Sequence, residues 1–394
     1  KYFVFECVPH LNSPYIYIPF ILLIIASIGV FLGLFYRISS VLLFLSFTYI
    51  ELLDISYYLN HYYFVSLTSL VLIFVPANHC FSLDIKWRRL KPYSHIPQYQ
   101  IFVFKILLAL VYVYAGIAKI NYDWLFNAMP LKIWLKAQYD MPVFGSLFRY
   151  DITAYIFSWM GMIYDLTIVF FLSYKRTRIP AYLSVLFFHG ITGYLFQIGV
   201  FPLVMSTLTL IFFPTSLHNR MIHGINKILP LASINSNYTL GPDFSRFKKI
   251  VFFIFFIFQF VFPFRYLLYQ GNMYWTEEGY RFGWRVMLVE KAGTATFYVS
   301  NPENGKEWII DNSQFLNNHQ EKQMSFQPDM ILQYAHFLDH HFKENYHISD
   351  PIVRAEVYVT LNSRPSKLLF DPQLDLSLIK DSFKPKTWIY HYEN

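Results

Sequence analysis

Apolar runs of near-membrane length, separated by short polar loops, dominate the first two thirds of the chain. A membrane-spanning helix needs about 20 mostly apolar residues. Eight runs reach or approach that length: residues 16–36, 40–59, 62–77, 100–120, 151–174, 180–198, 200–214 and 249–268. The runs at 62–77 and 200–214 are short, and we expect them to tilt against neighbouring helices or to extend by a few residues. The pattern predicts a polytopic α-helical membrane protein with about eight visible spans.

Two parts of the chain depart from this pattern. Residues 126–150 mix apolar positions with charged residues and prolines, which predicts an interfacial helix rather than a span. From residue 270 onward polar residues are frequent. We predict strands there at 283–301, 308–311 and 353–361, and a helix at Asp329–Tyr346. The first of these strands is expected to turn as a hairpin at Ala292-Gly293. We therefore predict a transmembrane domain at 1–269 and an α+β domain at 270–394.

Basic residues gather in the loops on one side of the predicted membrane. The clusters are Arg37; Lys86, Arg88, Arg89 and Lys91; Lys175, Arg176 and Arg178; and Arg220, Lys227, Arg246, Lys248 and Lys249. With eight crossings all of them fall on the same side, which the positive-inside rule makes cytoplasmic. The start of the chain and the α+β domain then lie outside. The abrupt beginning KYFVFE leads us to expect a preceding piece, whose additional span would make nine.

Composition agrees with a membrane protein and excludes several other classes. The chain is 55% hydrophobic, 21% aromatic and only 14% charged, and the mean hydropathy is +0.33. A soluble protein would carry nearly twice the charge. The net charge of +7 comes from the loop clusters that set orientation, so we predict no nucleic-acid partner. Two cysteines make no disulfide framework. The sequence contains no GxSxG, P-loop or GxGxxG motif.

Lys119 closes an otherwise apolar stretch and is the first candidate for chemistry. An ionisable side chain in a span is expensive, and an amine in apolar surroundings can lose its proton and act as a base. The alternative is an anchor whose ammonium extends to the lipid headgroups. The predicted orientation places Lys119 at the outer end of its helix and brings Asp54, Asn60 and His61 to the same depth. We therefore predict a polar site at the external mouth, beside the α+β domain.

Other ionisable residues leave alternatives open. His189, in the middle of a span, either hydrogen-bonds to another helix or contacts a ligand. Asp165 must be paired or protonated inside the membrane, and we expect it to serve helix packing. His336 and His340 share one helix face but lack an HExxH motif and a clear third ligand, so we predict no metal site. The residues alone indicate a membrane enzyme or transporter with a polar site at the outer face.

Five separated blocks carry a family resemblance. They are LLDISYYLNHYY (52–63), PANHCFSLD (76–84), YAGIAKINYDWL (114–125), FHGITGYLFQIGVFPLVM (188–205) and LLYQGNMYWTEEGYRFGWRVML (267–288). In this order the chain resembles the vitamin K-dependent γ-glutamyl carboxylases and their bacterial relatives, the HTTM-domain proteins. The resemblance runs from about residue 15 to the C-terminus. It implies a bacterial inner-membrane protein whose C-terminal domain lies outside the cytoplasm.

The resemblance also implies a reaction and roles for residues. Lys119 matches the weak base that deprotonates vitamin K hydroquinone, of the menaquinone or phylloquinone type, before dioxygen adds. The strong base so formed removes a γ-proton from a substrate glutamate, which captures carbon dioxide, and vitamin K 2,3-epoxide is released. No metal takes part. Asn60 and His61 match a pair that contacts the quinone oxygens, and His189 joins them as a cofactor-binding candidate. Arg281 and Arg285 are either contacts for a Glu-containing peptide or solvated surface charges.

The function predicted from the sequence is thus a carboxylase with coupled epoxidase activity in the lipid bilayer. One alternative is a related quinol epoxidase or oxygenase that does not carboxylate protein. Another is a transporter or lipid-binding protein on the same scaffold. A transporter should show inverted repeats and broken helices at the bilayer midplane, and the sequence shows neither clearly.

Overall fold

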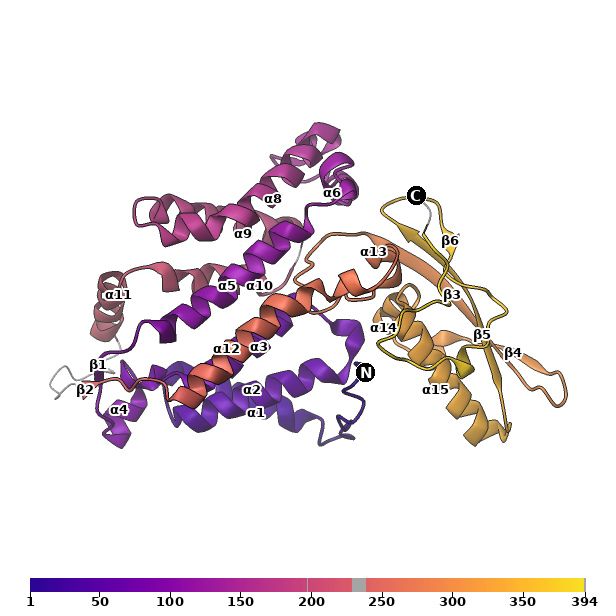
Figure 1. The fold of residues 1–394 in the computed structure, drawn as a ribbon, viewed down its shortest axis with the longest axis horizontal. Coiled ribbons are helices and arrows are strands. Elements are labelled where there is room, and N and C mark those ends of the chain that lie inside the picture. Colours follow the sequence, from indigo (N-terminus) through magenta and orange to yellow (C-terminus); the bar gives the residue numbers. More distant parts are fainter. Residues whose placement is uncertain (197, 229–238, 393–394) are drawn as a thin grey trace.

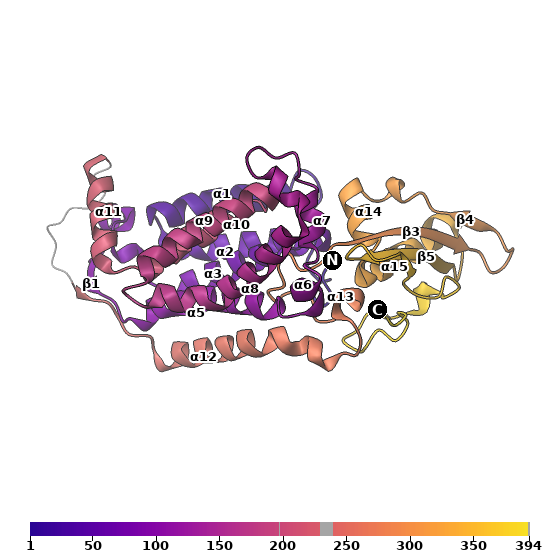
Figure 2. The same cartoon turned by 90° about the horizontal axis from the view of Figure 1, so that it is seen from above.

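The structure is a computed structural model that describes residues 1–196, 198–228 and 239–392. Its first two thirds form a bundle of helices, and the last third forms a separate layer around a β-sheet at one end of the bundle (Figure 1). The view turned by 90° shows the long helices running side by side toward that end (Figure 2). The C-terminal domain therefore caps one end of the bundle.

The helices of the bundle follow the apolar runs of the sequence. They are α1 (Tyr17–Leu32), α2 (Tyr36–Leu53), α3 (Asn60–Phe74), α5 (Tyr99–Ala118), α8 (Asp151–Ser173), α9 (Arg178–Phe196), α10 (Phe201–Leu208) and α12 (Arg246–Val261). In the described part of the chain, five helices are long and apolar enough to cross a membrane: α2, α5, α8, α9, and α12 with its continuation to Leu268. The chain is therefore an integral membrane protein. The apolar helices α1 and α3 are shorter than this, and eight crossings stay a prediction.

The predicted run at 200–214 is one arm of a bent pair. Helix α10 continues as a 3₁₀ turn over Thr209–Phe212, and α11 (Thr215–Ile228) then departs at 119°. Pro214 stands at the bend, where a proline favours a break in helical hydrogen bonding. None of the residues of α11 is buried. Only the two arms together are long and apolar enough to cross a membrane.

The region 126–150 does not form the single interfacial helix that the sequence predicted. It contains part of α6 (Tyr122–Phe126), then α7 (Leu131–Lys136) and a 3₁₀ turn at Gly145–Arg149. Prolines 130 and 142 explain the interruptions, since a proline inside a helix removes a hydrogen bond and clashes with the preceding turn. At the opposite end of the bundle, the short helix α4 (Leu83–Arg88) precedes an unpredicted parallel pair, β1 (Tyr93–His95) and β2 (Thr239–Leu240).

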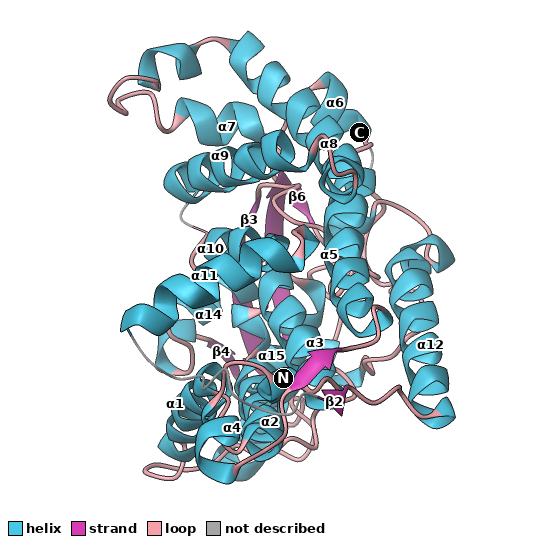
Figure 3. Ribbon diagram, turned by 90° about the vertical axis from the view of Figure 1, so that its left-hand side faces the viewer, coloured by secondary structure: helices cyan, strands magenta, loops and turns pink. Residues whose placement is uncertain are grey.

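The C-terminal domain contains an antiparallel sheet of strand order β4-β3-β5-β6. The strands are β3 (Lys291–Ser300), β4 (Glu307–Ile309), β5 (Ile352–Leu361) and β6 (Lys367–Leu368), and the helices are α13 (Met273–Thr276), α14 (Asn318–Met324) and α15 (Pro328–Tyr346). In Figure 3 the strands labelled β3, β4 and β6 lie behind the helices of the bundle. The predicted helix at 329–346 and the strand at 353–361 are confirmed by α15 and β5.

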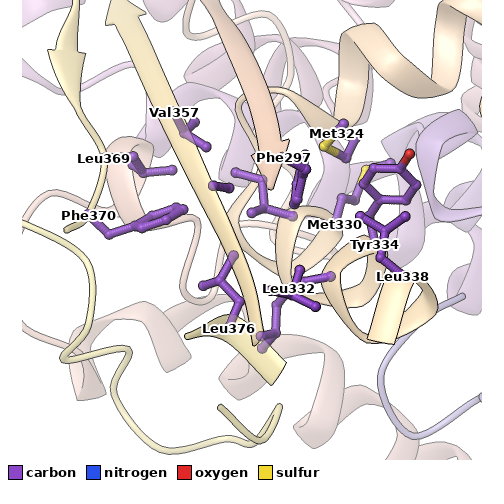
Figure 4. Close-up of a cluster of buried hydrophobic side chains, with 14 of the residues drawn as sticks. Phe297, Met324, Met330, Leu332, Tyr334, Leu338, Val357, Leu369, Phe370 and Leu376 are labelled. Atoms are coloured by element: carbon purple, nitrogen blue, oxygen red, sulfur yellow. The ribbon is translucent and has the colours of Figure 1, made fainter. Parts of the chain in front are cut away.

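The core of this domain lies between the sheet and α15. Alternate residues of β5 point into it, and Phe297 of β3 packs edge-on against Tyr334 of α15 with ring centroids 4.9 Å apart (Figure 4). The same cluster of buried side chains includes Ile55, which follows α2 in the bundle. Because one apolar core contains residues from both parts of the chain, the sheet domain is docked firmly on the end of α2.

Of the strand predicted at 283–301, the part from 291 onward is confirmed by β3, whereas the part before it and the hairpin turn at Ala292-Gly293 are wrong. Residues 283–290 are not in a strand, and Trp284 and Met287 have φ values of 58° and 55° that no extended strand contains. Strand β3 runs straight through Ala292 and Gly293, pairing them with β5. A Cβ on Gly293 would lie 2.4 Å from the carbonyl oxygen of Ser325. Gly293 is thus a point of close backbone approach, which a strand glycine often marks, rather than a turn.

Replacing Gly293 by valine should destabilise the C-terminal domain by about 2 kcal/mol, because the end of α14 must move away from the sheet. Thermal unfolding of the purified protein in detergent measures the effect as a lower Tm. The matched control is Thr294→Val, at an exposed position of the same strand. Equal Tm values for the two variants would show that the close approach to Ser325 is unimportant.

Candidate active site

Lys119 lies at the C-terminal end of α5, and its side chain turns back into the bundle. The residue is 7% exposed. Its Nζ donates to Asp165 Oδ2 on α8 at 2.7 Å and to the carbonyl oxygen of Ala115 at 3.3 Å. Helical side chains lean toward the N-terminus of their helix, so a lysine at the outer end reaches inward. The interpretation of Lys119 as an anchor extended to the headgroups is therefore wrong.

A glycine on α5 lets the two charged residues meet. Gly116 lies against α8 so closely that a Cβ would stand 2.8 Å from the Leu166 side chain and 2.9 Å from its backbone nitrogen. Small residues allow such close approach between membrane helices. Leu166 is the neighbour of Asp165, and Gly116 precedes Lys119 by less than one helical turn. The contact thus sets the separation of the Lys119–Asp165 pair.

Lys119 lines a cavity of about 100 Å³, here called the Lys119 cavity. Its walls come from α5 to α10 and from Val286 and Met287. Most of the lining is apolar, and the large aromatic members are Trp124, Trp134, Phe157, Phe188, Phe196 and Phe201. The Nζ of Lys119 lies 5.3 Å from the Trp124 ring centroid, within cation–π range. A flat aromatic ligand suits such walls.

His189 is the second nitrogen base on the wall of the Lys119 cavity. It is buried, and its Nε2 lies 2.8 Å from the hydroxyl of Tyr112 on α5. Its Nδ1 has no hydrogen-bond partner among the described residues. Both alternatives from the sequence therefore have a structural counterpart, since one nitrogen bonds to another helix and the other is left for a ligand. A buried polar atom without a partner is costly and calls for an explanation.

Asn60 and His61 lie at the same end of the bundle, but neither lines the Lys119 cavity. The Nδ2 of Asn60 donates to the carbonyl oxygen of Arg285 at 2.8 Å, next to Val286 on the cavity wall. The His61 ring packs against Phe201, another wall residue, with centroids 5.4 Å apart. Asp54 instead accepts a hydrogen bond from Gln320 of α14 at 2.8 Å. The predicted polar cluster is thus divided between the cavity wall and the domain interface.

Arg285 is buried and the side chain of Arg281 is only 12% exposed, so their interpretation as solvated surface charges is wrong. Arg281 donates to Asp329 and Gln327. Burial lowers the pKa of Arg281, but the carboxylates of Asp329 and Glu277 outweigh that effect and raise it. Burial likewise raises the pKa of Asp329, and Arg281 reverses this and lowers it. Arg281 is therefore committed to a structural ion pair.

Arg285 has a different environment. Its side chain donates to the carbonyl oxygen of Gly283 at 3.2 Å, and its Nε has no hydrogen-bond partner in the described ranges. Burial lowers the pKa of Arg285. The guanidinium lies 4.3 Å from the ring centroid of Tyr266 and lines a second cavity of about 470 Å³, here called the Arg285 cavity. This arginine can still bind an anion.

The two cavities lie on opposite sides of the same two chain segments. On α5, Ala118 lines the Arg285 cavity and Lys119 lines the Lys119 cavity. In the segment after Gly283, Arg285 lines the Arg285 cavity and Val286 lines the Lys119 cavity. The positive φ of Trp284 and Met287 gives this segment its irregular path. A thin wall therefore separates an apolar cavity from a more polar one.

Asp123 follows Lys119 closely in sequence but points to the C-terminal domain. It accepts two hydrogen bonds from Arg364, at 2.6 and 2.8 Å, and one from Asn362 at 2.8 Å. Trp124, next in the chain, is buried, and its Nε1 donates to the carbonyl oxygen of Ser158 on α8 at 2.8 Å. The NYDWL segment thus fastens the end of α5 to the sheet domain on one side and to α8 on the other.

The structure adds two residues to the site, Asp165 and Tyr112. Asp165 was recognised in the sequence as an intramembrane acid, but helix packing was expected to be its role because it lies deeper than Lys119. The inward turn of the lysine side chain removes that difference in depth. Tyr112 is seven residues before Lys119, on the same face of α5, and that spacing was the available signal.

The described residues contain no group of three or more His, Cys, Asp or Glu side chains that could hold a metal ion. The Nε2 of His336 is hydrogen-bonded to the carbonyl oxygen of Ile379 at 2.8 Å, and the Nδ1 of His340 lies 3.3 Å from Glu344 Oε2. The pair that the sequence analysis considered for zinc therefore has ordinary structural partners in this part of the chain.

Two family models match the chain. The model for the HTTM domain matches residues 1–216, and the model for the vitamin K-dependent gamma-carboxylase lumenal domain matches residues 244–394. No solved structure matches the chain. The first match contains Lys119, Asp165 and His189, and the second contains Arg285, so both cavities draw on both matched regions.

Replacing Asp123 by asparagine should weaken the contact between bundle and sheet domain by about 1 kcal/mol at neutral pH, since a bidentate pair whose side chains are 28% and 20% exposed is lost. Burial raises the pKa of Asp123, but hydrogen bonds from Arg364 and Asn362 lower it below its usual value. A carboxylate with a lowered pKa stabilises the folded state above about pH 4 and loses that effect as pH falls. The Tm difference from the native protein should therefore shrink in acid.

The matched control for this prediction is Asp350→Asn, at an exposed acid of the sheet domain. Thermal unfolding of the native protein and both variants is followed between neutral pH and pH 3. A Tm difference for Asp123→Asn that stays constant down to pH 3 would contradict the assigned ion pair.

Proposed function

The chain belongs to the vitamin K-dependent γ-carboxylase family, and we propose that it carboxylates glutamate residues of a peptide or protein. Its co-substrates are vitamin K hydroquinone, O₂ and CO₂, and its products are γ-carboxyglutamate and vitamin K 2,3-epoxide. The observation that carries the proposal is the Lys119 amine, buried in an apolar, aromatic cavity between helices.

The lining of the Lys119 cavity suits a naphthoquinol, but a volume of about 100 Å³ is too small for two fused rings, so the walls must move apart when the ligand binds. The aromatic walls suit its fused rings, and the unpartnered Nδ1 of His189 can bond to one of its oxygens. When bound, reduced vitamin K together with O₂ supplies the strong base that abstracts the γ-proton of glutamate. Since the cavity lies between membrane-spanning helices, a prenyl tail can remain in the surrounding lipid.

Lys119 acts as the weak base that accepts the proton of the quinol hydroxyl. A lysine does this only as a neutral amine, and apolar surroundings favour the neutral form. The walls also exclude water, which would quench a strongly basic centre. Tyr112 holds His189 through its Nε2 at 2.8 Å and so fixes the direction of the free Nδ1.

The family resemblance assigns Asn60 and His61 to the quinone oxygens. In this structure they contact residues that form the wall of the Lys119 cavity and do not line the cavity themselves. Asn60 holds the backbone of Arg285 and so fixes the position of Val286. His61 supports the Phe201 ring. Contact with the quinone oxygens themselves would require these side chains to enter the cavity when the ligand binds.

Arg285 is our candidate for binding the substrate glutamate. The Arg285 cavity lies beside the sheet domain and has room for a peptide side chain. A guanidinium binds a carboxylate with charge-assisted hydrogen bonds. Arg281 does not serve this purpose, because its donors are already bound to Asp329 and Gln327. The thin wall between the cavities would let the glutamate approach the reacting centre.

We further propose the orientation predicted from the loop charges. The end of the bundle that carries Lys119 and the sheet domain faces outside the cytoplasm of a bacterial inner membrane, after eight crossings of this chain. On this view residues 1–269 form the membrane-embedded catalytic domain and residues 270–394 the extracytoplasmic domain. The dense contacts between the two, through Asp123 and Arg364, favour their acting as one catalytic unit.

A quinol epoxidase without protein carboxylation is the second candidate, because the Lys119 cavity is complete without Arg285. Purified protein is supplied with reduced vitamin K, O₂, labelled bicarbonate and a Glu-containing peptide. Label in the peptide together with epoxide supports the carboxylase. Epoxide without label supports the epoxidase, and absence of quinol turnover would contradict both.

In the same assay Lys119→Ala should lower epoxide formation by a factor of about 100 or more, the usual contribution of a positioned base. A small exogenous amine should restore part of the activity, because it can enter the space left by the side chain. The matched control is Lys136→Ala, which removes a half-exposed lysine paired with Asp151. Native activity of the Lys119 variant would exclude this lysine as the base.

Replacing Arg285 by glutamine should raise the KM for the peptide about tenfold or more, the effect of losing a charge-assisted hydrogen bond. The KM for the quinol should stay unchanged, because Arg285 lies on the far side of the wall. Arg149→Gln, at an exposed arginine, is the control. A peptide KM equal to that of the native enzyme would remove Arg285 from the substrate site.

A further inference from the structure

Lys119 has an unusual position for a buried amine. It stands at the very end of α5, one residue beyond the last helical turn, where a lysine side chain normally extends into water or headgroups. Its side chain instead turns inward and is almost fully buried. The weak 3.3 Å contact with Ala115 would not hold it there alone. The 2.7 Å hydrogen bond to Asp165 is the stronger constraint.

Asp165 is itself held rigidly. It lies in the interior of α8, is 5% exposed, and is flanked by Leu166, which packs directly on Gly116. Helix packing does not require this carboxylate, because Gly116 and Leu166 already make the close contact without it. An acid in this position is expensive unless it is paired or protonated. The free-energy cost of burying the Asp165 carboxylate indicates that this residue has a function other than helix packing.

We propose that Asp165 is the positioning residue for Lys119. It holds the amine inside the Lys119 cavity and, in the resting enzyme, takes the proton that the amine must lack. The step breaks an N–H bond of Lys119, forms an O–H bond on Asp165 Oδ2, and frees the nitrogen lone pair. This role rests on the proposed function, since it prepares Lys119 to act as a base.

The apolar surroundings favour this transfer. An ammonium–carboxylate pair must lose the hydration of two charges, whereas an amine beside a carboxylic acid carries none. The proton moves along an existing hydrogen bond of 2.7 Å. The other titratable side chains around the pair are Tyr112 on α5, Tyr164 on α8 and His189 on α9. All three are unchanged in the variants below.

The first test needs no catalytic activity. Detergent-solubilised full-length protein is treated with a water-soluble acylating reagent, and modification of Lys119 is measured by peptide mass spectrometry. Lys119 should be protected in the native protein and in Asp165→Asn, whose amide oxygen still accepts the hydrogen bond. It should lose protection in Asp165→Leu, where the amine is free to extend outward. Protection that persists in Asp165→Leu overturns the proposal.

Two controls accompany the labelling. Lys380, an exposed lysine of the sheet domain that is not paired with Asp151, reports the reactivity of the reagent in every sample. Asp151→Leu makes the same substitution as Asp165→Leu, on the same helix α8 but at an exposed acid, and should leave Lys119 protected. Loss of protection in this control would show a general loosening of the bundle and would also count against a specific role of Asp165.

The second test uses quinol epoxidation. Asp165→Leu should lose activity about 100-fold, as for loss of the base itself, and a small amine should restore part of it, which a merely misfolded variant would not show. Asp165→Asn should become dependent on pH, with activity falling as pH is lowered, because Lys119 must then release its proton to solvent. A native pH profile and rate in Asp165→Asn overturn the proposal. If native protein lacks quinol turnover while the labelling responds as expected, the proposed reaction fails and the positioning of Lys119 stands.

Discussion

The cost of charge inside an apolar bundle is the constraint on which this structure depends. Lys119 and Asp165 are each expensive in a membrane-spanning region, and each is tolerable because the other lies 2.7 Å away. They meet because Gly116 lets α5 approach α8 to backbone contact at Leu166. The aromatic side chains of the Lys119 cavity then enclose the pair and keep water from it. A larger residue at Gly116 would therefore disturb the separation of the helices, the Lys119–Asp165 pair and the cavity together.

The second organising feature is the irregular segment that follows the bundle. Between Gly283 and Leu288 the chain passes along the end of α5, with Arg285 in one cavity and Val286 in the other. Asn60 holds this segment from α3, and Arg364 binds Asp123 from the sheet domain. The sheet domain is thus part of the site, since its docking determines where the wall between the two cavities stands. Such an arrangement suits a reaction whose lipid-soluble and peptide substrates arrive from different sides.

Much of the helical architecture follows from the sequence pattern, whereas details of the site do not. The apolar runs predicted every long helix of the bundle, and the loop charges correctly brought the ends of α2 and α5 together beside the C-terminal domain. Within the site, Lys119 stands at the end of its helix as predicted, but its amine lies deeper in the bundle, because counting residues along a helix ignores the direction of a long side chain. Asp123 lies four residues from Lys119 in the sequence, yet it binds Arg364 in another domain. The hairpin at Ala292-Gly293 failed for a related reason, since Gly293 serves a contact with Ser325 that no local pattern reveals.

By itself the sequence determined that this chain is a membrane protein, which residues lie in its helices, and which lysine is the base candidate, because hydrophobic length and isolated charges are local properties. The resemblance of its five blocks identified the family. Only the tertiary structure decided that Asp165 pairs with Lys119, that Arg281 is neutralised while Arg285 is left available, and that Asn60 and His61 stand behind the cavity wall. Those relations join residues from different elements. The pairing of two buried ionisable side chains depends on distances of a few ångströms between elements that are far apart in the chain.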